Sequence, residues 1–326
     1  MHAATIRSLS GARADRTHRS GAVAADCLGS APEAAASSDA RSVVQVRAPK
    51  RVSNAPARFR MLGVDIDNVS MEKAIGLVMT AVRGSKPCSF AFVNADCLNI
   101  AQELPAYAAV LARQDRVFAD GSGVRWMARA RGIRVSGNVN GTDMFPLLCG
   151  AAAAAKASVF LLGGKPEVAA DAARNMVADV PELSIAGTHH GYFGPEGDDA
   201  VIAMINRSGA QILLVGLGAP LQEAWIAKHR DRLAPKVVMG VGGLFDYFSG
   251  RIARAPALLR FTGTEWIWRM AQEPRRLWRR YILGNPVFVA RCLREQLSQT
   301  AGAPRSATVL TFEHMQAGTP SVTQAG

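Results

Sequence analysis

Residues 211–243, QILLVGLGAPLQEAWIAKHRDRLAPKVVMGVGG, contain the pattern that decides the fold. Two short apolar runs, QILLVGLG and KVVMGVGG, each end in glycine and have the length of a buried strand. The segment PLQEAWIAKHRDRL between them keeps an apolar face at helical spacing. A strand, a glycine turn, a helix and a second strand in this order are typical of two parallel strands joined by a helix.

The same alternation of strand and helix runs along the chain from residue 58. Further strands are expected in FRMLGVDIDNVS, CSFAFV, RVFA, SVFLLGG and LSIAG. Helices are expected in EVAADAARNMVADV and in SMEKAIGLVMTAVR, with Ser70 as the N-cap. This order predicts an α/β fold with a parallel sheet flanked by helices on both faces. Ligands of such sheets bind beyond the carboxyl ends of the strands, so the residues that follow each strand are the site candidates.

Composition divides the chain into four segments. Residues 1–57 hold no Phe, Trp or Tyr and are rich in Ala, Ser and Arg. They bury too little apolar surface to offset chain entropy, so a disordered tail is expected there. The predicted α/β domain is expected over 58–256, and a helical appendage rich in Arg and Trp is expected over 257–297. A second disordered tail is expected over 298–326.

The formal net charge of +12 favours an anionic partner. Nucleic acid, a phospholipid surface and a phosphorylated substrate all fit this charge. The five cysteines are scattered and form no CxxC pair, which indicates neither a disulfide framework nor a zinc site. No apolar run is long enough to span a membrane, and arginines interrupt the N-terminal segment where a secretory signal needs apolar residues. A cytoplasmic location is therefore expected.

A carboxylate follows one predicted strand in the segment FADGSGVRW. Asp120 comes directly after the apolar run, and the glycines at 121 and 123 leave room for a ligand to approach. This position suits a general base. An Asp in front of a helix more commonly serves as its N-cap, and position alone favours that alternative.

Three glycine-rich turns, LLGGKPE, VGLGAPLQE and GVGGLFD, connect predicted strands to helices. Such turns present backbone N–H groups and a helix N-terminus to phosphate. Together they favour binding of a nucleotide or diphosphate at Gly163, Gly164, Gly216, Gly218, Gly242 and Gly243. Each turn alone is more often only a tight turn, since none spells GxGxxG or GxxxxGKS/T. Gln222 is a candidate for hydrogen bonds to a sugar or base, with an exposed helical Gln as the ordinary alternative.

The VDID segment contains Asp65 and Asp67, a spacing with which many sugar-nucleotide transferases hold a divalent metal. In a strand the two side chains point to the same side. An exposed face of the first strand is the simpler interpretation. No metal site is therefore predicted.

The C-terminal segment 251–294 contains ten arginines, no lysine and only Glu265 and Glu273 as acids. Arginine binds phosphate through two parallel hydrogen bonds, whereas lysine acts as a point charge. Pro274 is expected to break or kink the helix. If the segment stays roughly helical, the 3.6-residue period places Arg269, Arg276 and Arg280 on one stripe. Arg279 then lies beside this stripe. Such a stripe can close over a diphosphate, and the alternatives are a solvated basic face and a surface that rests on anionic lipid.

In the order and spacing of its motifs, the chain from about Met61 to Arg280 resembles the TagA/CpsF/WecG family of bacterial glycosyltransferases. The resemblance rests on FVNADCLNIA, FADGSGVRW, GTDMF, FLLGGKPEVA, LLVGLGAPLQE, GVGGLFDYFSGRIARAP and EWIWRMAQEPRRLWRRY. It implies a Rossmann-like domain that needs no metal or other cofactor, and a C-terminal appendage that docks on the membrane and completes the active site.

The reaction that the resemblance implies is an inverting sugar transfer in cell-envelope or exopolysaccharide biosynthesis. The donor is a UDP-sugar, and the transferred group is N-acetylmannosamine, its uronic acid or a hexose. The acceptor is a sugar carried on undecaprenyl diphosphate. The implied place of action is the inner face of the plasma membrane, where a peripheral protein meets its acceptor.

The resemblance also implies roles for individual residues. The family's proposed catalytic base falls on Asp120, its acceptor-side Asn on Asn94 and its active-site Gln on Gln222. Three arginines of the family's appendage fall on Arg269, Arg276 and Arg279. Members often carry Thr two residues before the Asn, where this chain has Phe92, so any hydroxyl contribution there is absent or supplied elsewhere.

Two other classes of protein use some of the same features. A nucleic-acid-binding protein would use the positive charge, but the sequence has no RNP, zinc-finger or recognition-helix pattern. A nucleotide-dependent oxidoreductase would use the fold, but GxGxxG and the acid about 20 residues later are missing. The expected partners are therefore the UDP-sugar, the lipid-linked acceptor and an anionic membrane surface, without nucleic acid. The oligomeric state is left open, including a homo-oligomer.

Overall fold

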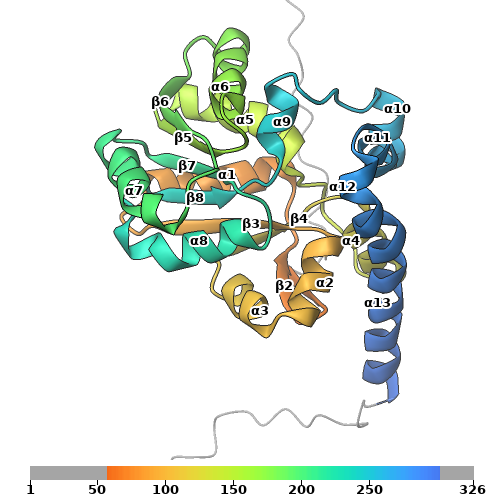
Figure 1. Ribbon diagram of the computed structural model, residues 1–326. Helices are drawn as coiled ribbons and strands as arrows, with labels where there is room; N and C mark the ends of the chain where they lie inside the picture. Colours follow the sequence, from red (N-terminus) through yellow and green to blue (C-terminus); the bar gives the residue numbers. More distant parts are fainter. Residues whose placement is uncertain (1–56, 302–326) are drawn as a thin grey trace, which may run out of the picture. The chain divides into compact units, whose positions relative to one another are not determined.

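The computed structural model describes residues 57–301, which form an eight-stranded sheet with helices on both faces (Figure 1). The strands lie in the order β1-β2-β4-β3-β8-β7-β5-β6. The pairings from β2 through β6 are parallel, and β1 runs antiparallel to β2. The strands span β1 Arg58–Met61, β2 Val64–Asp67, β3 Cys88–Val93, β4 Arg116–Ala119, β5 Ser158–Gly163, β6 Ser184–His189, β7 Ile212–Gly216 and β8 Val237–Gly240. The prediction of an α/β fold is confirmed.

Most predicted elements recur in the structure with small shifts at their ends. The six apolar runs after residue 87 became β3 to β8, because strands buried on both faces are apolar at nearly every position. Ser70 caps α1 (Met71–Arg83) as predicted, and its side chain accepts a hydrogen bond from the backbone N–H of Lys73 at 3.3 Å. The predicted strand, helix and strand over 211–243 are β7, α8 (Leu221–His229) and β8.

The first predicted strand is a hairpin in the structure. β1 and β2 pair around Leu62 and Gly63, whose φ angles of +46° and +77° form the turn. Glycine adopts such angles without strain, which is why the chain reverses at this point. Asp65 on β2 is exposed and pairs with Arg60 on β1, as an exposed strand face predicts.

The second carboxylate of β2 is not exposed. Asp67 is buried because Arg58 and Arg116 each pair with it at 3.0 Å, and it also accepts a hydrogen bond from the backbone N–H of Val117. The expectation of two exposed carboxylates is therefore wrong for Asp67. Its partners come from β1 and β4, so its burial depends on the pairing of strands that the local pattern does not reveal.

Helices cover both faces of the sheet and build three apolar clusters. α1, α5, α6 and α9 lie on one face, and α2, α3, α4, α7 and α8 lie on the other. Alternate residues of a central strand enter opposite faces, as Phe90 and Phe92 do on one side and Ala91 and Val93 on the other. These helices span α2 Ala95–Glu103, α3 Pro105–Ala112, α4 Ser122–Ala130, α5 Gly141–Ala154, α6 Val168–Asp179, α7 Asp198–Arg207 and α9 Leu244–Phe248.

The C-terminal appendage is a chain of short helices followed by one long helix. It comprises α10 Ala257–Thr262, α11 Glu265–Gln272, α12 Pro274–Trp278, a π-helical turn Arg279–Leu283 and α13 Gly284–Ala301. The predicted break at Pro274 is present, since Glu273 leaves the helical region with φ −130° and ψ 58°. α13 packs beside α2 and α4 (Figure 1) and buries Phe288 and Cys292 in their apolar cluster.

The boundaries of the appendage differ slightly from the prediction. α10 begins at residue 257, and α13 continues past residue 297 to Ala301. The predicted tails at 1–57 and 298–326 otherwise lie outside the described residues. Within residues 57–301, none of the helices is long and apolar enough to cross a bilayer.

Candidate active site

A cavity of about 1160 Å³ lies beyond the carboxyl ends of the central strands. Its floor is formed by the residues that follow β3, β4, β7 and β8, and its walls come from α4 and the appendage. Many residues that the sequence singled out line this one space, namely Asn94, Asp120, Gly218, Gln222, Gly242, Gly243, Arg269 and Arg276. The parallel sheet therefore gathers side chains from distant parts of the chain at one edge, as its topology predicts.

Asp120 lines the cavity and does not cap a helix. Its backbone N–H continues the sheet by donating to Val93 O at 2.8 Å. The N-cap of α4 is Gly121, and no side chain caps this helix end. Gly121 has φ +85°, an angle that a residue with a Cβ adopts only with strain. The capping alternative for Asp120 is therefore wrong.

The surroundings of Asp120 shift its proton affinity toward neutral pH. Burial raises its pKa from 3.8 to about 6, because a desolvated carboxylate is disfavoured. The Arg280 guanidinium and a hydrogen bond from Asn94 oppose this rise, while the carboxylates of Glu265 and Asp143 add to it. A carboxylate with a pKa near 6 is ionised at neutral pH and still binds a proton well, which suits a general base.

Asn94 links α2 to the candidate base. Its side-chain oxygen accepts hydrogen bonds from the backbone N–H groups of Asp96 and Cys97, both at 3.1 Å, and so caps α2. Its amide nitrogen remains to donate to Asp120. The helix cap thus fixes the orientation of the amide that faces Asp120.

Three arginines of the appendage line the cavity despite the break at Pro274. They are the members of the stripe that the helical period placed together, namely Arg269, Arg276 and Arg280. α11, α12 and the π-helical turn each contribute one of these arginines.

Each of these arginines is held by a carboxylate of the protein. Arg269 is 7% exposed, lies 2.9 Å from Glu273 and stacks 4.5 Å above the ring of Tyr247. Arg276 approaches the other oxygen of Glu273 at 2.8 Å. Arg280 lies 3.4 Å from Asp96. The carboxylates hold the guanidinium groups in place, and an entering diphosphate would compete with them for the same donors.

Arg279 lies outside the described lining of the cavity. Its guanidinium stacks 5.4 Å from the ring of Trp278, and both side chains are exposed. Arg279 and Arg280 are consecutive residues of the π-helical turn, so their side chains point in different directions around it. The structure thus brings Arg280, rather than the Arg279 that the resemblance indicated, to the candidate base.

Arg125 also lines the cavity, and the sequence analysis did not select it. It makes no hydrogen bond or ion pair within residues 57–301, and its buried Nε lacks a partner there. Burial lowers the pKa of Arg125, with Arg129 acting in the same direction and Asp120 opposing. An anion in the cavity would therefore meet a guanidinium that forms no ion pair with a described carboxylate. Its place in FADGSGVRW, five residues after Asp120, was the signal available in the sequence.

Gln222 is buried beneath the cavity floor. It is 3% exposed, so the alternative of an exposed helical Gln is wrong. Its oxygen accepts from Gly218 N at 3.2 Å and from Gly242 N at 2.8 Å, and its nitrogen donates to Glu223 at 2.7 Å. The amide therefore ties together the two glycine-rich loops after β7 and β8.

The six glycines of the predicted nucleotide site divide into two groups. Gly218, Gly242 and Gly243 line the cavity, and an added Cβ at Gly218 or Gly242 would meet no atom within 4 Å. Both have positive φ angles, of +83° and +59°, so their backbone lies open to a ligand.

The other three glycines lie outside the described cavity lining and serve packing. A Cβ on Gly163 would lie 2.4 Å from the backbone oxygen of Gly216, and one on Gly216 would lie 2.8 Å from that of Gly242. A Cβ on Gly164 would lie 2.7 Å from Val168. These glycines allow neighbouring turns to approach closely, and the predicted contact with a nucleotide stays a prediction for them.

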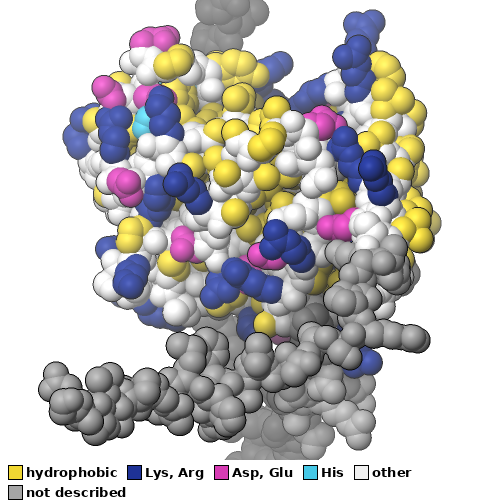
Figure 2. Space-filling model, turned by 90° about the horizontal axis from the view of Figure 1, so that it is seen from below, with side chains coloured by type: hydrophobic (Ala, Val, Ile, Leu, Met, Phe, Trp, Pro, Cys, Tyr) yellow, Lys and Arg dark blue, Asp and Glu magenta, His cyan; other side chains and the backbone are white. Residues whose placement is uncertain are grey.

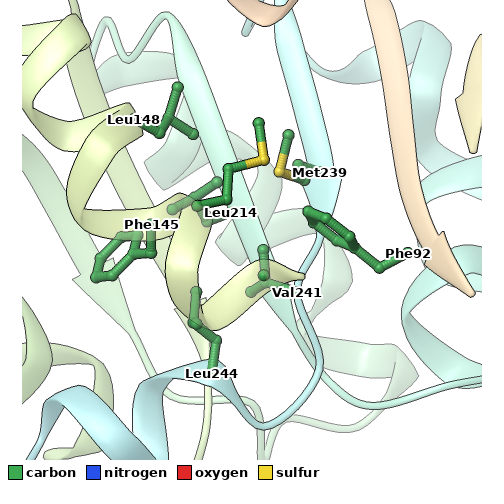
Figure 3. Close-up of a pocket in the computed structure, with 9 residues that line it drawn as sticks. Phe92, Phe145, Leu148, Leu214, Met239, Val241 and Leu244 are labelled. Carbon is green, nitrogen blue, oxygen red and sulfur yellow. The ribbon is translucent and has the colours of Figure 1, made fainter. Parts of the chain in front are cut away.

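A small apolar hollow of about 10 Å³ adjoins the cavity and shares Phe92 and Val241 with its lining. Figure 3 shows the ring of Phe92 directed toward Met239, with Leu214 and Phe145 on the opposite side. Phe92 is 7% exposed and packs with the core. Phe92, which stands where members of the family often carry Thr, therefore forms an apolar wall and supplies no hydroxyl to the cavity.

Comparison with known families adds one finding to this geometry. A family model described as "Glycosyl transferase WecG/TagA/CpsF family" matches residues 59–302. The match extends from β1 to the end of α13 and includes Asp120, Arg125 and the arginines of the appendage.

Proposed function

The protein belongs to the WecG/TagA/CpsF family of glycosyltransferases, enzymes of cell-envelope polysaccharide synthesis, and we propose that it moves a sugar from a UDP-sugar to a sugar carried on undecaprenyl diphosphate. The transferred group is N-acetylmannosamine, its uronic acid or another hexose, so the enzyme is a hexosyltransferase. The observation that carries the proposal is a cavity that combines a carboxylate of raised pKa with four arginines.

The proposed step is a single displacement with inversion at the anomeric carbon of the donor. The acceptor hydroxyl oxygen forms a bond to that carbon while the bond from the carbon to the UDP oxygen breaks. Asp120 takes the hydroxyl proton, and the electron pair of the broken bond leaves with UDP. A positioned base of this kind contributes roughly 10²- to 10⁴-fold to the rate.

Arginines and backbone N–H groups are proposed to balance the charge that develops on UDP. Arg269, Arg276 and Arg280 line the cavity, and the open backbone of Gly218 and Gly242 faces the same space. Fixed donors aimed at a developing negative charge are usually the largest catalytic contribution. Because the guanidinium groups supply this positive charge, we propose a reaction that requires neither a metal nor another cofactor.

The place of action is proposed to be the cytoplasmic face of the plasma membrane. Figure 2 shows hydrophobic side chains gathered along the edge of the view where the C-terminal helices lie. The exposed apolar residues of this region include Leu258, Trp278 and Leu283. Exposed aromatic and aliphatic side chains beside arginines are typical of a surface that rests on anionic lipid.

Ligand binding separates this function from the two other classes. Trp126 and Trp266 line the cavity, so their fluorescence reports its occupancy. We expect UDP to quench or shift this fluorescence with a saturable curve in buffer that contains EDTA, and NADH and a DNA oligomer to bind more weakly. Tighter binding of NADH would favour an oxidoreductase. Tighter binding of DNA, weakening steeply with salt, would favour a nucleic-acid-binding protein.

A further inference from the structure

The cavity does not end at its polar centre but continues along one side of α13. The apolar residues of this region that line it include Ile282, Pro286, Val289 and Leu293. Their spacing of four, three and four residues places them on one stripe of the helix. From the first to the last, the stripe extends about 16 Å at 1.5 Å per residue.

The opposite side of this groove belongs to α4. Trp126 and Met127 line the cavity there, and Trp126 is 47% exposed. The groove has a rigid base, because Phe288 and Cys292 of α13 are buried in the core cluster. We call the six lining residues Trp126, Met127, Ile282, Pro286, Val289 and Leu293 the α13 groove.

The exposed apolar side chains of the appendage fall into two sets. Ile282, Val289 and Leu293 are 50%, 41% and 49% exposed and open into the cavity. Leu283 and Val287 are 52% and 41% exposed and lie outside the described cavity lining. A helix that only rests on a membrane needs a single apolar face turned to lipid. The second set serves that purpose, whereas the first set faces the space that contains the arginines.

A cavity with this distribution fits an amphiphile that has an anionic head and a hydrocarbon chain. Its polar end presents Arg125, Arg269, Arg276 and Arg280, and its apolar end is the α13 groove. We propose that the α13 groove binds the first part of the polyprenyl chain of the lipid-linked acceptor, while Arg125, which precedes Trp126 and Met127 on α4, holds its diphosphate. The inference rests on the proposed function and adds a binding site for the lipid chain, separate from the membrane-facing side of α13.

Binding of two prenyl diphosphates tests this site without any sugar transfer. Undecaprenyl diphosphate and dimethylallyl diphosphate share the head group but differ in chain length, and both can be titrated in the same detergent. The groove variant is Val289→Thr with Leu293→Gln. The matched control is Val287→Thr with Leu283→Gln, which makes the same changes at similarly exposed positions outside the cavity.

We expect the wild-type protein to bind undecaprenyl diphosphate at least tenfold more tightly than dimethylallyl diphosphate, because a buried chain adds apolar contact. The groove variant should lose about tenfold in affinity for the long chain and keep its affinity for the short one. The control should bind both as the wild type does. Equal affinities of the two variants for the long chain would overturn the groove. Failure of the wild-type protein to bind either diphosphate would overturn the proposed acceptor, and the groove with it.

Discussion

Replacing Asp120 by Asn is expected to lower sugar transfer by at least roughly 10²- to 10⁴-fold while UDP binding stays close to that of the wild type. The amide has nearly the shape of the carboxylate but cannot take the proton of the acceptor hydroxyl. Asp120 lies in the turn after β4. In the proposed mechanism it takes the proton of the acceptor hydroxyl and does not bind UDP. Rates of UDP release and the dissociation constant of UDP measure the two effects separately.

The stability of this variant is the control. The folded protein holds the Asp120 proton more tightly than the unfolded chain does, since its pKa rises from 3.8 to about 6. The stability that this proton contributes is present below the lower value and is lost as the pH rises through about 6. Above that pH the ionised carboxylate destabilises the folded protein because it is desolvated, and the uncharged Asn has no such effect. We therefore expect a Tm at pH 7.5 no lower than that of the wild type. Wild-type rates in this variant would remove Asp120 from the mechanism.

Replacing Arg280 by Gln is expected to lower turnover by about 10²- to 10³-fold, the usual loss on removing one donor that faces a developing negative charge. The adjacent Arg279→Gln is the matched control, because Arg279 is exposed beside Trp278 and lies outside the described cavity lining. We expect that control to stay within about twofold of the wild type. Steady-state rates at several donor concentrations give kcat and KM for each variant.

The pH dependence of the Arg280→Gln variant distinguishes a role in the site from a role in folding. The Arg280 guanidinium lowers the pKa of Asp120, so its loss should move the acidic limb of the rate profile to higher pH. A purely structural arginine would leave the limb where it is. A large loss in Arg279→Gln with little change in Arg280→Gln would reverse the assignment of these two residues and restore the one that resemblance indicated.

Most of the fold was predictable because local sequence patterns determine its strands and helices. Apolar runs of strand length, glycines after them and helical spacing between them gave six strands and three helices close to their observed bounds. The hairpin at Leu62 and Gly63 was missed because a short turn inside one apolar stretch leaves the periodicity almost unchanged. The burial of Asp67 was missed because Arg116, one of its partners, lies on a strand that is distant in sequence.

The candidate site was predictable where one residue sits directly at a strand end. Asp120 and Asn94 follow β4 and β3, so the topology alone brings them together. The helical period also selected Arg280 in addition to Arg269 and Arg276, although resemblance favoured its neighbour.

Roles that depend on packing could not be predicted from the sequence. The pattern of glycine after a strand does not distinguish Gly218, which faces the cavity, from Gly163, which makes room for another turn. Gln222 was assigned to a ligand because the sequence does not show that the residue is buried and bonded to two loops. Arg125 was overlooked because its lack of a carboxylate partner within the described residues is visible only in the structure.

The most direct test of a metal-free transfer with Asp120 as base is the pH–rate profile of UDP release in EDTA. Purified protein, a set of UDP-sugars and an undecaprenyl-diphosphate-linked sugar are the components. Turnover should persist in EDTA with one of the donors, stay high at neutral pH and fall as the pH drops through about 6, because burial raises the pKa of Asp120 to that value. Turnover that disappears in EDTA and returns with Mg²⁺ or Mn²⁺, or a rate that does not fall between pH 7 and pH 5, would contradict the account.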